Sequence, residues 1–128
     1  MKKELQAFRS KSEQIIAQIL MKYGIRYEYE KQIRVNEIQG NNKLESLWYP
    51  DFFLTDYNIF VELIGKPEDR GYMEGFEKKK NIFKNENIPV LFVFPHEIWN
   101  FRGEKPKQKK EFEFGVIISI LLHPKTNS

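Results

Sequence analysis

Two carboxylates lie in the most apolar stretch of the chain, WYPDFFLTDYNIFVELIG, which runs from Trp48 to Gly65. Asp51 and Glu62 interrupt residues that are otherwise typical of buried β-strands. The four residues TDYN separate the two apolar segments, and a connection of this length predicts a β-hairpin. If residue 54 pairs with residue 59, Asp51 lies directly opposite Glu62, with Cα atoms about 4.5–5.5 Å apart.

Two like charges at that distance repel each other, and partial burial increases the cost. A divalent cation between the two carboxylates removes the problem, and Mg²⁺ or Mn²⁺ prefers such oxygen ligands. In the structural alternative, Asp51 only follows Pro50 at a strand start and Glu62 faces solvent. However, the segment Phe60–Ile64 is apolar on both sides of Glu62, so an unpaired carboxylate there would be expensive. We therefore expect Asp51 and Glu62 to form a metal site.

The elements that must position these residues follow from composition and periodicity. The chain has 128 residues, of which 41% are hydrophobic, and this predicts a single domain over residues 1–128 with one core. It has no cysteine, which excludes disulfides and thiolate metal sites. Apolar spacing and turn residues predict an α/β sandwich with a mixed sheet. The expected helices are residues 10–23 (or from about residue 3), 72–86 and 112–122, and the expected strands are residues 25–38, 44–54, 59–65 and 88–94. A basic loop over residues 101–111 precedes the last helix.

The segment Tyr49-Pro50-Asp51-Phe52, the hairpin, and Val61-Glu62 with Gly65 soon after resemble the PD-(D/E)XK nuclease superfamily. The resemblance covers roughly Glu13 to Trp99. It implies an αβββαβ restriction-endonuclease-like core, with a mixed central sheet flanked by helices. It also implies Mg²⁺- or Mn²⁺-dependent hydrolysis of phosphodiester bonds, with DNA as the expected substrate and endonuclease action favoured over exonuclease action. Asp51 and Glu62 would then hold one or two metal ions, with the backbone carbonyl of Leu63 as a further ligand.

The chain departs from the superfamily pattern at one position. The usual lysine, two residues after the glutamate, is replaced by Ile64, and some members supply this lysine from the following helix instead. Lys79 falls on the helical stripe of Tyr72, Phe76 and Phe83, so its side chain should point toward the sheet. We predict Lys79 as the catalytic lysine and Lys66, near the strand end, as the second candidate. In the alternative, Lys79 only extends past the aromatic rings to water.

A glutamate from the first helix often reaches the metal site of this superfamily, and Glu13 is the candidate. Glu13 shares a helical face with Ile16 and Leu20, so it can point at the sheet. The sequence Ser10-Lys11-Ser12-Glu13 also fits a capping box, in which Glu13 only stabilises the helix start. Both interpretations stay open at this point.

The charge distribution suggests a partner. The net charge is +3, and lysines cluster in residues 78–84 and 105–110. Such clusters bind phosphates or are simply solvated faces. We expect a nucleic acid, DNA foremost, as the partner, and a homodimer through residues 112–122 because the chain is small for an enzyme that cuts both strands of a duplex.

Two other functional classes compete with the nuclease. One is a nucleic-acid-binding module that kept the nuclease fold and lost catalysis, which the missing lysine at position 64 favours. The other is an interaction protein in which the acidic pair is incidental. The chain shows neither an apolar signal core nor a membrane-length segment, so a soluble cytoplasmic protein with no membrane partner is expected.

Overall fold

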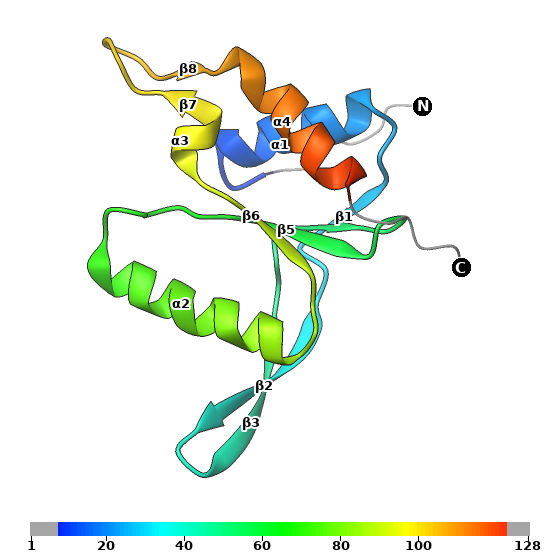
Figure 1. The fold of residues 1–128 in the computed structure, drawn as a ribbon, viewed down its shortest axis with the longest axis vertical. Helices are drawn as coiled ribbons and strands as arrows, with labels where there is room; N and C mark the ends of the chain where they lie inside the picture. The colour runs from blue at the N-terminus through cyan, green and yellow to red at the C-terminus, as the bar shows by residue number, and fades with distance from the viewer. Residues whose placement is uncertain (1–7, 123–128) are drawn as a thin grey trace.

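The computed structural model describes residues 8–122, which form a mixed sheet with helices on both of its faces (Figure 1). The four strands follow the spatial order β1-β4-β5-β6. The pairs β1–β4 and β4–β5 are antiparallel, and β5–β6 is parallel. The predicted mixed α/β architecture is therefore confirmed. The strand bounds are β1 (Tyr27–Tyr29), β4 (Phe52–Leu54), β5 (Ile59–Leu63) and β6 (Val90–Val93).

Helices α1 (Lys11–Lys22) and α4 (Lys110–Leu121) cover one face of the sheet, and α2 (Arg70–Asn85) covers the other (Figure 1). The main core forms between the sheet and the α1–α4 layer, where Phe52 and Val61 pack among aliphatic residues of both helices. Because side chains alternate along a strand, Glu62 then lies on the opposite face of β5, toward α2. The sheet thus separates a large apolar layer from the layer that contains Glu62.

A second antiparallel hairpin, β2 (Ile33–Gln39) with β3 (Asn42–Trp48), continues the β1–β4 ladder. Paired residue numbers add to 81 in both ladders, as in Tyr27 with Leu54 and Ile33 with Trp48, so the two ladders keep one register. The prediction of continuous strands over 25–38 and 44–54 was wrong, because each strand breaks in the middle.

Two residues mark these breaks. Glu30 has a positive φ of 52°, and Pro50 has no N–H to donate to a ladder. A backbone hydrogen bond crosses the bend, from the Glu30 N–H to the Asp51 carbonyl at 3.0 Å. The bend directs the β2–β3 hairpin away from the main sheet (Figure 1). Asp51 lies at this corner, between the end of β3 and the start of β4.

The helix ends agree with the capping signals. Helix α1 begins at Lys11, where the Ser10 hydroxyl accepts the Glu13 N–H at 3.2 Å, so an earlier start is wrong for residues 8–10. The proposed start near residue 3 lies outside the described residues. Helix α2 begins at Arg70, because the Asp69 carboxylate accepts the Tyr72 N–H at 2.9 Å.

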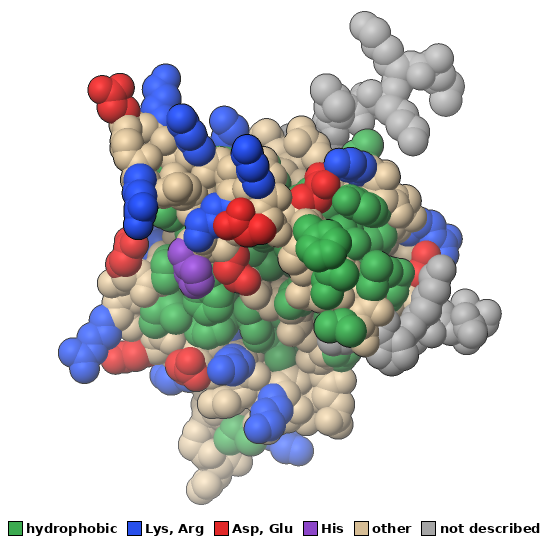
Figure 2. Space-filling model, turned by 45° about the horizontal axis from the view of Figure 1, so that its top comes forward, with side chains coloured by type: hydrophobic (Ala, Val, Ile, Leu, Met, Phe, Trp, Pro, Cys, Tyr) green, Lys and Arg blue, Asp and Glu red, His purple; other side chains and the backbone are tan. Residues whose placement is uncertain are grey.

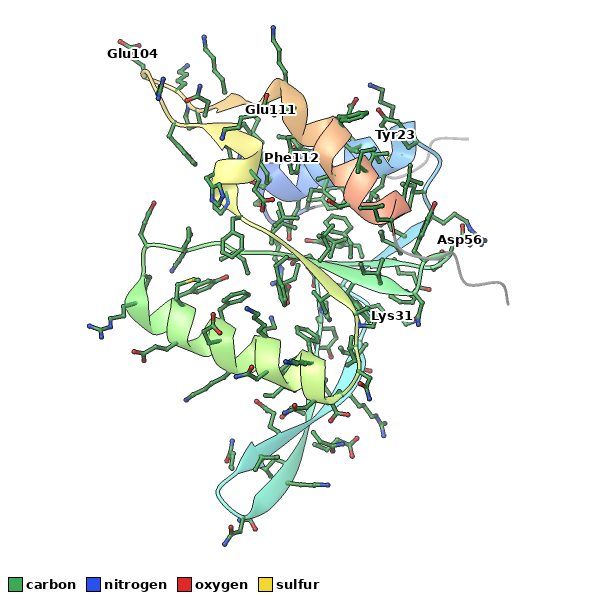
Figure 3. The ribbon with its side chains drawn as sticks, viewed as in Figure 1. Tyr23, Lys31, Asp56, Glu104, Glu111 and Phe112 are labelled. Carbon is green, nitrogen blue, oxygen red and sulfur yellow. The ribbon has the colours of Figure 1, made fainter. Side chains whose placement is uncertain are left out.

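Residues 95–108, which overlap the expected basic loop at 101–111, contain short elements that no pattern in the sequence indicates. A one-turn helix α3 (Pro95–Ile98) leads into a small hairpin of β7 (Trp99–Asn100) and β8 (Lys107–Gln108). The Lys109 N–H donates to the Ile98 carbonyl at 2.7 Å and closes the hairpin at its base. Glu104 lies at its outer tip (Figure 3).

The C-terminal segment is a helix, as predicted. Phe112 of α4 points inward toward the core (Figure 3), whereas Phe114, Ile118 and Leu121 stay exposed at 69%, 41% and 58%. The homodimer expected at this segment stays a prediction. Within residues 8–122, no helix has the length and apolar character that a membrane crossing requires.

Candidate active site

The β4–β5 hairpin brings Asp51 and Glu62 together. The pairs Phe52–Val61 and Leu54–Ile59 confirm the predicted register, and Asp51 is the next residue beyond this ladder. Its carboxylate Oδ2 accepts the backbone N–H of Leu63 at 2.7 Å. Asp51 is thereby fixed at the corner of the bent strand, beside the end of β5.

The environment of Asp51 disfavours its charged form. Burial, followed by the nearby Glu62 carboxylate, raises the pKa of Asp51 from its ordinary 3.8 to about 6. The Leu63 N–H and the positive charge of Lys79 act in the opposite direction and lower this pKa. Two carboxylates held this close by the fold form a site that favours an added positive charge.

Lys79 supplies one positive charge at this site. Its Nζ lies 2.6 Å from Oε2 of Glu62, whose residue is only 7% exposed. Oε2 of Glu62 is buried and accepts no well-aligned hydrogen bond. Its short contact with Lys79 is therefore an ion pair and not a directed hydrogen bond. The ammonium also lies 5.6 Å from the centre of the Trp48 ring, a cation–π distance.

Helix α2 directs Lys79 toward the sheet by its aromatic stripe. Phe76 and Phe83 are buried beneath the helix, and the Tyr72 hydroxyl accepts the Gly65 N–H at 2.9 Å. Lys79 falls on the same stripe, as the spacing predicted, whereas the flanking Lys78 and Lys80 are exposed.

Lys66, the second candidate, is exposed in the loop that follows β5. Of the two lysines, Lys79 is the one that contacts Glu62. The catalytic role of either lysine stays a prediction.

Glu13, the third predicted carboxylate, lies on α1, in the layer on the other face of the sheet. It is 4% exposed, and its Oε2 accepts the Tyr29 hydroxyl and the Arg9 N–H, each at 2.9 Å. Burial, and to a smaller degree the charge of Asp51, raises the pKa of Glu13. The Ser10 hydroxyl caps the Glu13 N–H, whereas the Glu13 carboxylate accepts the N–H of Arg9 and not that of Ser10, so only half of the predicted capping box forms. A role of Glu13 in metal binding stays a prediction.

Two contributors were not predicted. Tyr29, read only as part of an alternating strand, holds the Glu13 carboxylate. Trp48 packs edge-on against Phe83 with ring centres 5.2 Å apart and also faces Lys79. No short motif indicates either contact, because each joins elements that are distant in sequence.

The protein ligands for a metal are few. Within the described residues, no group of three or more His, Cys, Asp or Glu side chains could hold a metal ion. Asp51 and Glu62 offer two carboxylates, and the Leu63 carbonyl projects to the same side of β5 as the N–H that contacts Asp51. Mg²⁺ commonly binds through one or two carboxylates together with waters and substrate phosphates. These residues therefore fit a Mg²⁺ site that the substrate completes, and not an all-protein cage.

Comparisons of the chain with protein-family models, with curated proteins and with solved structures found no significant match. Any function must therefore be inferred from the geometry of Asp51, Glu62 and Lys79 themselves.

Proposed function

We propose that this chain is a metal-dependent nuclease of the PD-(D/E)XK type, with DNA as its expected substrate. The observation that carries the proposal is the convergence of three side chains in one partly buried site. Asp51 and Glu62 come from neighbouring antiparallel strands, and Lys79 comes from the helix that follows. Two neighbouring carboxylates, of which one has a raised pKa as Asp51 does, are more typical of a functional site than of a structural one.

The order of elements supports the same proposal. When the bent strands are each counted once, α1 is followed by three antiparallel strands, namely β1 with β2, β3 with β4, and β5. Helix α2 then crosses over to β6, which is parallel to β5. This order agrees with the αβββαβ core that the resemblance implies, and it supports the proposal.

In the proposed mechanism, Asp51 and Glu62 would hold the metal, and the Leu63 N–H keeps the Asp51 carboxylate oriented. Bound Mg²⁺ would supply Lewis-acid polarisation of the phosphate and an acidified water. Lys79 would stabilise the negative charge that develops on the phosphate, because its ammonium is already held at the carboxylates. Glu13, whose carboxylate is held by the Tyr29 hydroxyl, is the further acidic residue that the resemblance assigns to such a site.

A catalytically degenerate nucleic-acid-binding module is the second candidate. The observation in its favour is Ile64, which is 3% exposed and occupies the position at which this superfamily usually has its lysine. In that case, the contact between Lys79 and Glu62 would be a structural ion pair that neutralises a buried carboxylate.

The deciding experiment is a cleavage assay with labelled single-stranded, duplex and branched DNA, and with RNA, in Mg²⁺, Mn²⁺ or EDTA. Glu62→Gln should reduce cleavage by more than about 100-fold, because even outer-shell partners of metal ligands contribute about 10–100-fold. Glu77→Gln, on the exposed side of α2, is the matched control and should cleave like the wild type. Binding of nucleic acid without cleavage on any substrate would favour the degenerate module, and equal activity of both variants would exclude Glu62 as a ligand.

A further inference from the structure

The β7–β8 hairpin, residues 99–108, is a basic element that the proposed active site does not use. The hairpin and the two residues after it contain one acidic residue, Glu104, against five basic ones: Arg102, Lys105, Lys107, Lys109 and Lys110. Lysine and arginine side chains gather over this end of the molecule (Figure 2). An excess of positive charge on one projecting hairpin is typical of a surface that contacts phosphates.

An aromatic pocket lies at the base of this charged hairpin. It has a volume of about 310 Å³ and is lined by Lys11, Trp99, Phe101, Lys105 and Pro106. This volume is at the lower end of the range for small-molecule sites, about 300–1,000 Å³. Phe101 is 59% exposed, so much of its ring is available for contact.

The pocket is joined to the candidate active site through the first turn of α1. The Trp99 indole N–H donates to the Ser12 hydroxyl at 2.9 Å, and Ser12 directly precedes Glu13. Lys11, one residue earlier, lines the pocket. A strand that lies across the pocket would therefore pass beside the N-terminus of α1, whose first turn contains Glu13.

We propose that this pocket binds one unpaired nucleotide of a nucleic-acid strand, with its base stacked on Phe101 and its phosphates held by Lys11 and Lys105. Exposed aromatic rings between lysines are the means by which proteins hold single strands, because every base offers a flat face. Base pairs in a duplex are stacked on each other and do not offer that face to a side chain. The inference rests on the proposed function in one respect: the bound strand would be the substrate of the neighbouring site.

The test is fluorescence anisotropy of labelled oligodeoxythymidylate, and of a duplex of the same length, with the full chain in EDTA. Because no metal is present, binding is measured whether or not the protein is a nuclease. Phe101→Ala should weaken binding of the single strand by roughly 5- to 150-fold, the range for loss of one stacked base. Phe114→Ala is the matched control, because Phe114 is an exposed phenylalanine on α4, outside the hairpin.

The lysines are tested by the salt dependence of the same binding. Lys105→Ala should reduce the slope of log K against log salt by about 0.7. Lys43→Ala, on the β2–β3 hairpin at the opposite end of the molecule, should leave the slope unchanged (Figure 1). Circular dichroism would verify that each variant is folded.

Quenching of Trp99 fluorescence gives a second readout. The chain has two tryptophans, so the Trp48→Phe variant reports on Trp99 alone. If the single strand quenches Trp99 fluorescence and Phe101→Ala abolishes this quenching, the result would support nucleotide binding in the pocket. Equal binding by Phe101→Ala and Phe114→Ala, equal or tighter binding of the duplex, or no binding of either probe would each overturn the inference. None of these results depends on whether cleavage occurs.

Discussion

Replacing Asp51 with asparagine should make the folded protein more stable at neutral and alkaline pH, although it removes a proposed metal ligand. The fold raises the pKa of Asp51 from 3.8 to about 6, chiefly by burial and then by the charge of Glu62. Asparagine keeps an oxygen that can accept the Leu63 N–H, and it cannot ionise. The substitution therefore removes the buried charge and preserves the hydrogen bond.

The magnitude and the sign follow from proton linkage. Between pH 3.8 and about 6 the folded chain holds a proton on Asp51 that the unfolded chain has lost, so the free energy of unfolding falls as pH rises through this window. A shift of this size corresponds to about 3 kcal/mol at 1.36 kcal/mol per pKa unit. The gain from asparagine should be complete above about pH 6 and should vanish as pH falls toward 3.8.

Urea denaturation of the wild type and the variant, at about pH 8 and about pH 4, measures this difference. Asp56→Asn is the matched control, because Asp56 pairs with the exposed Arg26 and its loss should change stability by less than about 1 kcal/mol at either pH. A variant less stable than the wild type at pH 8, or a gain of equal size at both pH values, would refute the account of Asp51.

Stabilisation by Mg²⁺ tests whether Asp51 is a metal ligand. At 100 times its Kd, Mg²⁺ should stabilise the wild type at pH 8 by about 2.7 kcal/mol, because it binds the folded state. The same concentration should leave Asp51→Asn almost unchanged. Equal stabilisation of both proteins would place any Mg²⁺ site elsewhere.

Two further substitutions test the neighbours of Asp51. Lys79→Ala should reduce cleavage and should lower the free energy of unfolding by about 1–2 kcal/mol, which is less than the loss of a fully buried ion pair because the Lys79 side chain is 37% exposed. Lys80→Ala is the control, because Lys80 is exposed on the same helix. Equal losses in both variants would argue against a special role for Lys79. Tyr29→Phe should cost about 1–3 kcal/mol in urea denaturation, because it removes a donor to the buried Glu13 carboxylate. Tyr27→Phe on the same strand should cost less, and a Tyr29→Phe variant as stable as the wild type would show that the hydroxyl contributes nothing.

The features that the sequence predicted well depend on local rules. A four-residue loop between two apolar runs sets the register of β4 and β5, and that register alone brings Asp51 to Glu62. The helical stripe of Phe76 and Phe83 fixes the face of α2 and therefore the direction of Lys79. In each case the residues that determine the geometry lie within one element or one hairpin.

The features that were missed depend on contacts between distant segments. Glu30 adopts a positive φ, which its residue type does not favour, because the paired strands bend together at that point. The β7 and β8 strands have two residues each, too few for an alternation pattern to indicate them. Their position depends on the bond from Trp99 to Ser12, which joins residues 87 positions apart.

In the proposed nuclease, Ile64 occupies the position at which the superfamily usually has its lysine, and this difference has a direct physical interpretation. Glu62 and Ile64 are two residues apart, so they lie on the same face of the sheet, and α2 covers that face. A lysine at position 64 would approach Glu62 along the strand, whereas Lys79 approaches it from the helix above. Ile64 is 3% exposed and completes the apolar packing at the end of β5, while Lys79 brings its ammonium to 2.6 Å from the Glu62 carboxylate. The electrostatic contribution of a lysine depends on where its charge lies and not on which element carries it. Because Lys79 of α2 brings a positive charge to the Glu62 carboxylate, the apolar residue at position 64 is weak evidence that catalysis has been lost.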